Sequence, residues 1–385
     1  MRKLFLFFIP IFVLISCDWI FKDKTCSLDE SPTLSGTISE DTILLYDPDC
    51  PTYRMTDDVI IQDGAVLTIE SGITIVSEEG FGITVKADSG LNAIGTEDLP
   101  ITFTGREEAA GHWMGIKFSN TENESNVFSY VTIEYGGHDN WNFAEDASNL
   151  FIRESEVSVK NSTLRNSGGH GFYFYLSKVT EFNDNRITGN TLNPGTLYAN
   201  DIGDLSGTSA YTGNTHDSIT VISDEIVKDQ TWHALDVPYF FSGINHITEI
   251  KAALTIEAGA VLKFDENNGL RVKDEGSLSA VGTSGNAILF TGFEADSGHW
   301  RGLCFHGNDT GPNVLDNVTV EYGGSHYWYW GEDLVNILVR EADLTLTNST
   351  VRNSEGYGIY TYYGTVSQEK VTFENNTLGE IREEP

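Results

Sequence analysis

Basic residues are scarce in this chain of 385 residues. Lys and Arg together number 23, against 57 Asp and Glu, which gives a formal net charge of −34. Nucleic acids are bound through clustered Lys and Arg, so this balance predicts no nucleic-acid partner. Electrostatic docking on anionic lipid is disfavoured for the same reason. The chain is also no disordered acidic tail, because 39% of its residues are hydrophobic and 11% are aromatic.

Long apolar runs are absent except at the N-terminus. A basic pair at positions 2 and 3 precedes an apolar run over residues 4–15. A membrane-spanning helix needs about 20 apolar residues, so this run predicts a signal peptide. It ends in Leu-Ile-Ser before Cys17, which resembles the lipobox of bacterial lipoproteins. The resemblance implies cleavage after residue 16 and acylation of Cys17. The chain would then be anchored in the bacterial cell envelope, with the outer membrane or cell surface favoured over the inner membrane.

Cysteine is rare as well, with Cys17, Cys26, Cys50 and Cys304 the four in the chain. None has the spacing of a zinc site, so we expect no structural metal. Cys26 and Cys50 flank one N-terminal segment of a chain predicted to be exported, and we expect them to form a disulfide. Acidic runs such as 47–49 offer oxygen ligands for Ca²⁺, but none matches a known calcium loop, so we predict no cofactor.

Helical periodicity is missing after the signal peptide, and an internal repeat takes its place. LTIE at 67–70 recurs at 254–257, and VTIEYGG at 131–137 recurs as VTVEYGG at 318–324, each 187 positions later. Within each copy, apolar and polar residues alternate over short stretches punctuated by Gly, Asn, Asp and Ser, which predicts β-strands. A shorter period of about 20–30 residues with three strands indicates the coils of a parallel β-helix.

The strings LTIEAGAVLKF, ILFTG, GHWRGL and VTVEYGG resemble right-handed parallel β-helix proteins of the pectin-lyase-like superfamily. The resemblance implies an all-β, right-handed parallel β-helix solenoid built from two tandem sequence-similar halves. We expect a lipoprotein signal peptide (1–16), an N-terminal tether and cap (17–42), repeat half 1 (43–190), connecting coils (191–230) and repeat half 2 (231–385). Two separate β-helical domains joined near residues 212–215 are the alternative.

Charged pairs recur in both copies. Glu134 and Arg165 fall at equivalent positions of neighbouring coils, and Glu321 and Arg352 repeat them. We expect the four side chains to point outward and to form structural ion pairs, each contributing roughly 0.2–1 kcal/mol. A catalytic role is the alternative, since enzymes of this superfamily use acids and basic residues on such a face.

Aromatic residues gather in the loops that follow the two Tyr-Gly-Gly sequences. Partly exposed rings in such loops are stacking platforms for sugars, and a hydrophobic cover folded onto the coil is the alternative. The candidate ligand-binding residues are Trp141 and Phe143 in the first loop, and His326, Tyr327, Trp328, Tyr329 and Trp330 in the second.

We therefore predict a lipid-anchored cell-envelope protein whose β-helix is a rigid binding scaffold for polysaccharide or another cell-surface component. One alternative is a polysaccharide lyase or glycoside hydrolase, which would need a cluster of acids with Lys or Arg outside the duplicated positions. The sequence shows no such cluster, and we assign no catalytic residue. The other alternative is a structural spacer or protein-binding adhesin, because superfamily membership does not determine function.

Overall fold

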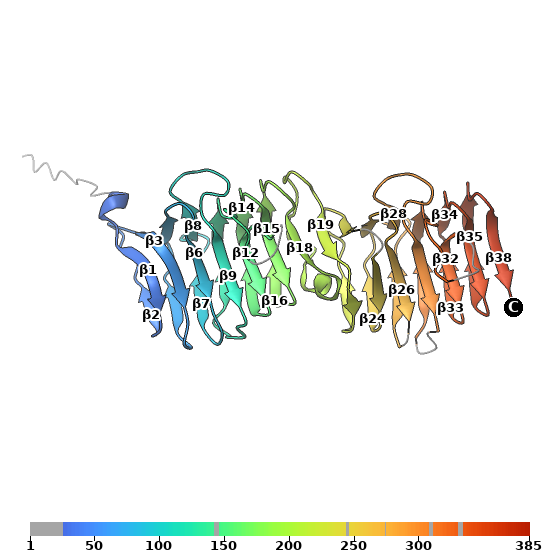
Figure 1. Ribbon diagram of the computed structural model, residues 1–385, viewed down its shortest axis with the longest axis horizontal. Coiled ribbons are helices and arrows are strands. Elements are labelled where there is room, and N and C mark those ends of the chain that lie inside the picture. Colours follow the sequence, from blue (N-terminus) through green and yellow to red (C-terminus); the bar gives the residue numbers. More distant parts are fainter. Residues whose placement is uncertain (1–25, 142–145, 244–245, 274, 308–310, 330–333) are drawn as a thin grey trace, which may run out of the picture.

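The protein is one elongated stack of β-coils (Figure 1). The computed structural model describes residues 26–141, 146–243, 246–273, 275–307, 311–329 and 334–385, so Cys17, Phe143 and Trp330 lie outside the described residues. The only helical elements in these ranges are two 3₁₀ turns, η1 (Leu28–Glu30) and η2 (Ala199–Asp204). No helix there is long and apolar enough to span a membrane. The predicted all-β solenoid is confirmed.

Three parallel ladders form the N-terminal part of the rod. Ladder 1 comprises β2 (Thr42–Leu44), β4 (Val66–Ile69), β7 (Gly90–Ile94), β10 (Val127–Ser129), β13 (Glu156–Lys160) and β16 (Lys178–Asn183). Ladder 2 comprises β1 (Thr33–Ile38), β3 (Thr52–Ile61), β5 (Thr74–Ser77), β8 (Ile101–Gly105), β11 (Val131–Glu134), β14 (Thr163–Arg165) and β17 (Arg186–Thr188). Ladder 3 begins with the C-terminal parts of β1 and β3, and continues with β6 (Gly82–Val85), β9 (Gly115–Ser119), β12 (Ser148–Arg153), β15 (His170–Tyr175) and β18 (Gly195–Tyr198).

Ladder 3 continues without a break into the C-terminal part. Its further strands are β19 (Ile219–Ile222), β22 (Tyr239–Ser242), β25 (Val261–Phe264), β28 (Ile288–Gly292), β31 (Val318–Glu321), β34 (Thr350–Arg352) and β37 (Thr372–Glu374). Ladder 4 comprises β20 (Glu225–Ile226), β23 (Ile247–Ile250), β26 (Gly269–Lys273), β29 (Gly302–His306), β32 (Val335–Arg340), β35 (Tyr357–Tyr362) and β38 (Gly379–Glu384). Ladder 5 comprises β21 (Gln230–Trp232), β24 (Ala253–Ile256), β27 (Ser277–Val281), β30 (Asn313–Asp316), β33 (Asp343–Thr347) and β36 (Thr365–Glu369).

The connecting coils shift the two parts of the rod by one ladder. By sequence, β11 of ladder 2 corresponds to β31, because Val131 and Val318 are 187 positions apart. Yet β31 belongs to the continuation of ladder 3. In the same way, β12 of ladder 3 corresponds to β32 of ladder 4. Residues that match in the repeat therefore lie on ladders that are not continuous with one another.

Apolar side chains that point inward fill the rod. Ring stacking runs along the axis, with ring centroids 4.6 Å apart for Phe241 and Phe264 and 4.4 Å apart for Phe264 and Trp300. The indole N–H of Trp300 donates to the carbonyl of Glu321 at 2.7 Å, and Trp113 donates to Glu134 in the same way. Each coil thus buries its apolar face against the next coil, as solenoid folding requires.

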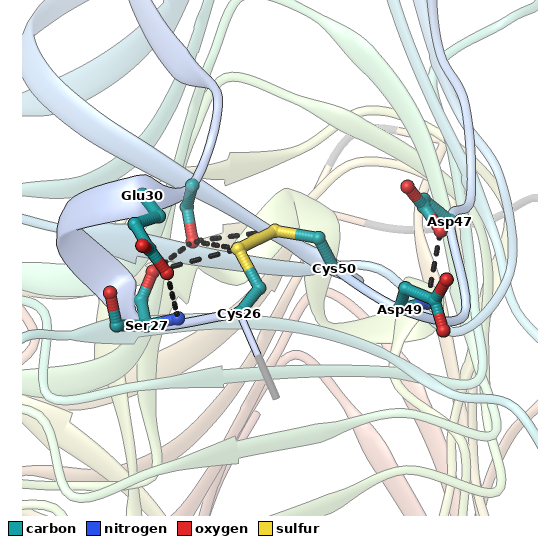
Figure 2. The surroundings of a disulfide bond; sticks show 7 residues. Cys26, Ser27, Glu30, Asp47, Asp49 and Cys50 are labelled. Atoms are coloured by element: carbon teal, nitrogen blue, oxygen red, sulfur yellow. Dashed lines mark hydrogen bonds between the residues drawn. A yellow bond between two sulfur atoms is a disulfide. The ribbon is translucent and has the colours of Figure 1, made fainter. Parts of the chain in front are cut away.

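A disulfide fastens the N-terminal end of the described chain. Cys26 and Cys50 are bonded, with Cα atoms 5.0 Å apart, and the η1 turn lies beside them (Figure 2). The sulfur of Cys26 also lies 3.8 Å from the hydroxyl oxygen of Ser31. This bond ties the chain before η1 to the segment that leads into β3.

Candidate functional site

The charged pairs lie on neighbouring coils, in the register that the repeat indicates. Glu134 pairs with Arg165 between β11 and β14, and the arginine Nε lies 2.6 Å from Glu134 Oε2. Arg352 Nε lies equally close to Glu321 Oε2. At these outward-facing positions both glutamates are nevertheless buried, at 8% and 6% exposure. Their second oxygens accept hydrogen bonds from the hydroxyl groups of Thr104 and Thr291.

The described part of the second aromatic loop, up to residue 329, packs against the rod. Trp328 is only 7% exposed, so its expected role as an open stacking platform is wrong. Its ring lies against Gly269, where an added Cβ would come within 2.6 Å of the indole. Beneath the loop, Cys304, Leu338 and Tyr360 point outward from ladder 4 and form a second apolar cluster with Trp328. The loop folds down because these outward side chains need burial.

The remaining loop residues differ in exposure. His326 and Tyr327 are exposed, and Tyr327 retains 53% of its surface. Tyr329 is partly buried between the side chains of His306 and Arg340. In the first loop, Trp141 is also partly buried, and the Lys117 ammonium lies 5.7 Å from its ring centroid. These contacts leave Tyr327 as the aromatic residue of the described loops with the most accessible ring.

Arginine and tyrosine stack in both repeats, on ladder 3 in the first and on ladder 4 in the second. The Arg153 guanidinium lies 5.8 Å from the Tyr175 ring centroid, and Tyr175 packs edge-on against Tyr198 at 5.4 Å. We name Arg153, Tyr175 and Tyr198 the first Arg–Tyr stack. All three are partly exposed, and Leu176 beside them is 53% exposed.

The second Arg–Tyr stack consists of Tyr329, Arg340, Tyr362 and Tyr363. The Arg340 guanidinium lies between two rings, 4.6 Å from the centroid of Tyr329 and 4.7 Å from that of Tyr362. Tyr363 packs edge-on against Tyr362 and is 66% exposed. Arg340 and Tyr362 stand 187 positions after Arg153 and Tyr175, so the two stacks are equivalent in the repeat.

A cavity of about 420 Å³ lies beside η2, between the last coils of repeat half 1 and the connecting coils. The η2 turn follows Tyr198 directly and replaces a strand between β18 and β19. Lys228 from the next coil reaches back to it, and its ammonium lies 3.3 Å from an oxygen of both Asp201 and Asp204. Burial raises the pKa of Asp201 to about 6 and that of Asp224 to about 7. Acids clustered with Lys are thus present at unduplicated positions.

Sequence reasoning missed this cluster because its members come from separate coils. Asp201 and Lys228 are 27 positions apart. Asp224 lies in the short link between β19 and β20. The sequence did hold a signal for this cluster. The connecting segment has no partner in the repeat, and yet it carries these acids and a lysine. In the described ranges, no three His, Cys, Asp or Glu side chains are grouped to hold a metal ion.

Residues 36–149 match a family model described as a pectate-lyase-like β-helix domain. No curated protein matches the chain significantly. Among solved structures, that of the periplasmic alginate epimerase AlgG covers 87% of this chain and 77% of its own, at 11% identity and a TM-score of 0.23. A mutant of AlgG gives 10% identity, 86% and 77% coverage and the same TM-score. This similarity is too low to transfer a function to the β-helix domain described here.

Proposed function

We propose that this protein is a lipid-anchored scaffold of the bacterial cell envelope whose rigid β-helix binds polysaccharide. The two Arg–Tyr stacks carry the proposal. Tyrosine rings offer flat amphipathic surfaces that lose little rotamer entropy on binding, which suits them to sugar rings. Tyr175 and Tyr362 are the last residues of β15 and β35, which are fixed in the stack of coils, so the backbone holds both rings in place before a ligand binds.

Glycan binding is tested on the soluble protein lacking residues 1–17. Tyr175 and Tyr362 are changed together, because they occupy equivalent places in the two repeats. The double variant Tyr175→Ala/Tyr362→Ala should weaken glycan binding on an array and in calorimetry at least tenfold. Phe293→Ala is the matched control, since Phe293 is exposed but lies outside both stacks. Absence of binding to any glycan by the unmodified protein would contradict the proposal.

Lipid anchoring is tested separately in cells. Cys17→Ala should abolish acylation, so that the protein leaves the detergent phase in partitioning and loses the lipid mass in mass spectrometry. Unchanged partitioning and mass would show that Cys17 is not the anchor, without bearing on glycan binding.

A further inference from the structure

The cavity beside η2 has features of a built site. It is lined by groups from five successive coils, and it shares Lys178 and Lys228 with an adjoining hollow of about 670 Å³. Its lining residues are Glu122, Glu154, Ser155, Glu156, Leu176, Ser177, Lys178, Asn200, Asp201 and Lys228. All of these fall within the described residues.

Asp201 is the side chain that points to a ligand. It is only 5% exposed, yet it lines the cavity. Its Oδ1 lies 3.3 Å from Lys228 Nζ, and a backbone hydrogen bond from Ser177 opposes the rise in its pKa that burial causes, whereas its buried Oδ2 meets no donor in good hydrogen-bond geometry among the described residues. Buried polar atoms are nearly always hydrogen-bonded, so an oxygen left over beside a cavity calls for a donor from outside the chain.

The neighbouring acids differ from Asp201 because each accepts a backbone hydrogen bond in good geometry. Asp204 Oδ2 accepts from the backbone N–H of Val179, and Asp224 Oδ1 accepts from that of Asn200. These bonds tie η2 to the coils on either side of it, where no ladder can do so. Asp201 is therefore the carboxylate of this cluster with a buried oxygen to spare.

The charges around the cavity select an uncharged ligand. Four of its lining side chains are acidic and two are lysines. Lys178 is already paired with Glu156 at 2.9 Å, and Lys228 is shared between Asp201 and Asp204. A carboxylate or sulfate on the ligand would be repelled by the surplus negative charge, whereas a hydroxyl group would donate a hydrogen bond to the Asp201 carboxylate.

The residues of the first Arg–Tyr stack lie close in sequence to residues that line the cavity. Leu176 lines the cavity and directly follows Tyr175, while Asn200 and Asp201 follow Tyr198 within three positions. A sugar ring lying on the tyrosines would thus present its edge hydroxyls to the cavity. Stacking on a flat face together with hydrogen bonds at the edge is the combination that a sugar requires.

We infer that the cavity beside η2 is a subsite for an uncharged, hydroxyl-rich sugar residue, with Asp201 as hydroxyl acceptor and Lys228 as the ammonium that orients it. The inference rests on the proposed glycan binding and deepens it by naming the sugar class. It also places Asp201 and Lys228, the two residues that would contact the sugar, in the connecting coils.

The test uses calorimetry of the soluble protein with defined oligosaccharides. The neutral probes are hexasaccharides of glucan, mannan and xylan, and the acidic probes are hexamers of galacturonate and of alginate. We expect a neutral probe to bind, and Asp201→Asn to weaken that binding at least tenfold, because an amide cannot replace the charged acceptor beside Lys228. Asp98→Asn is the matched control, since Asp98 is exposed and remote in sequence.

A second variant covers the case in which Asp201→Asn fails to fold. Leu176→Asp places a charge at the rim, at an exposed position with φ of 47°, which Asp tolerates well. It should also weaken binding at least tenfold. Binding unaffected by these variants, or confined to the acidic probes, would overturn the subsite and leave the proposed function standing. No binding of any probe would overturn both.

Discussion

At the scale of single residues, the connecting coils hold carboxyl groups whose protonation is coupled to folding. Asp224 caps the start of η2 by accepting the N–H of Asn200 at 3.0 Å, and this places it in a partly buried position. Burial raises its pKa to about 7. A carboxyl group with a raised pKa in the folded state favours folding while it is protonated, and this advantage is lost as the pH rises from about 4 through 7.

The variant Asp224→Asn should remove this pH dependence. The amide oxygen still accepts the N–H of Asn200, but no charge is buried at high pH. We expect the free energy of unfolding of the variant, relative to the unmodified protein, to rise by roughly 1–2 kcal/mol between pH 4 and pH 8, after a discount for solvent screening. Urea unfolding at both pH values measures the difference. A difference that is the same at both would contradict this account, and Asp98→Asn should change neither.

At the scale of turns and strands, buried asparagines hold the corners of the coils. Asn149 accepts the N–H of Gly136 at 2.8 Å and donates to the carbonyl of Arg165 at 2.8 Å, and it is fully buried. Gly136 must be glycine, because a Cβ there would lie 2.7 Å from the Asn149 amide oxygen. Asn336 makes the matching contacts with Gly323 and Arg352. The Tyr-Gly-Gly sequence is thus a requirement of the coil corner.

Replacing one of these asparagines should be costly. Asn149→Ala leaves the buried N–H of Gly136 without a partner and removes one of the two hydrogen bonds to the Arg165 carbonyl, which should lower the free energy of unfolding by roughly 1–3 kcal/mol. Asn336→Ala should cost a similar amount, because the contacts are the same. The exposed Asn286 provides the control, and its change to Ala should stay within about 0.5 kcal/mol. Denaturant unfolding measures all three, and equal effects of Asn149→Ala and Asn286→Ala would refute the argument.

Some elements were predictable and others were not, for identifiable reasons. The alternation of apolar residues and the 187-residue repeat report directly on inward-facing positions, so the coils could be predicted. The pairing of Glu134 with Arg165 followed from that register. The cover formed by Trp328 was the alternative to an open platform, and the loop sequence by itself does not decide between them, because the cover depends on apolar side chains that point outward. Leu338 and Tyr360 occupy such positions and were the available signal.

At the scale of the whole molecule, ladder 3 makes the rod continuous. It passes from β15 through β18, β19 and β22 into β25, so no gap separates the two repeats. The repeat alone could not show this, because it aligns residues in the two copies and says nothing of which strands are neighbours. The shift by one ladder at the connecting coils, and the cavity that accompanies it, have no counterpart in either repeat.

Continuity of ladder 3 predicts that the rod unfolds as one unit. In a solenoid, cooperativity depends on the interfaces between neighbouring coils, so a weak interface splits the transition. Thr220 lies in the middle of β19, paired with Thr196 on one side and Phe240 on the other. Proline there removes a ladder hydrogen bond and should uncouple the two parts.

Hydrogen exchange measured by mass spectrometry distinguishes the two parts, because peptides from 82–175 report on the first and peptides from 269–362 on the second. We expect equal opening free energies for both parts in the unmodified protein and in the control Thr220→Ala, and two distinct values in Thr220→Pro. Distinct values already present in the unmodified protein would show that the connecting coils are a weak joint in spite of their continuous hydrogen bonding.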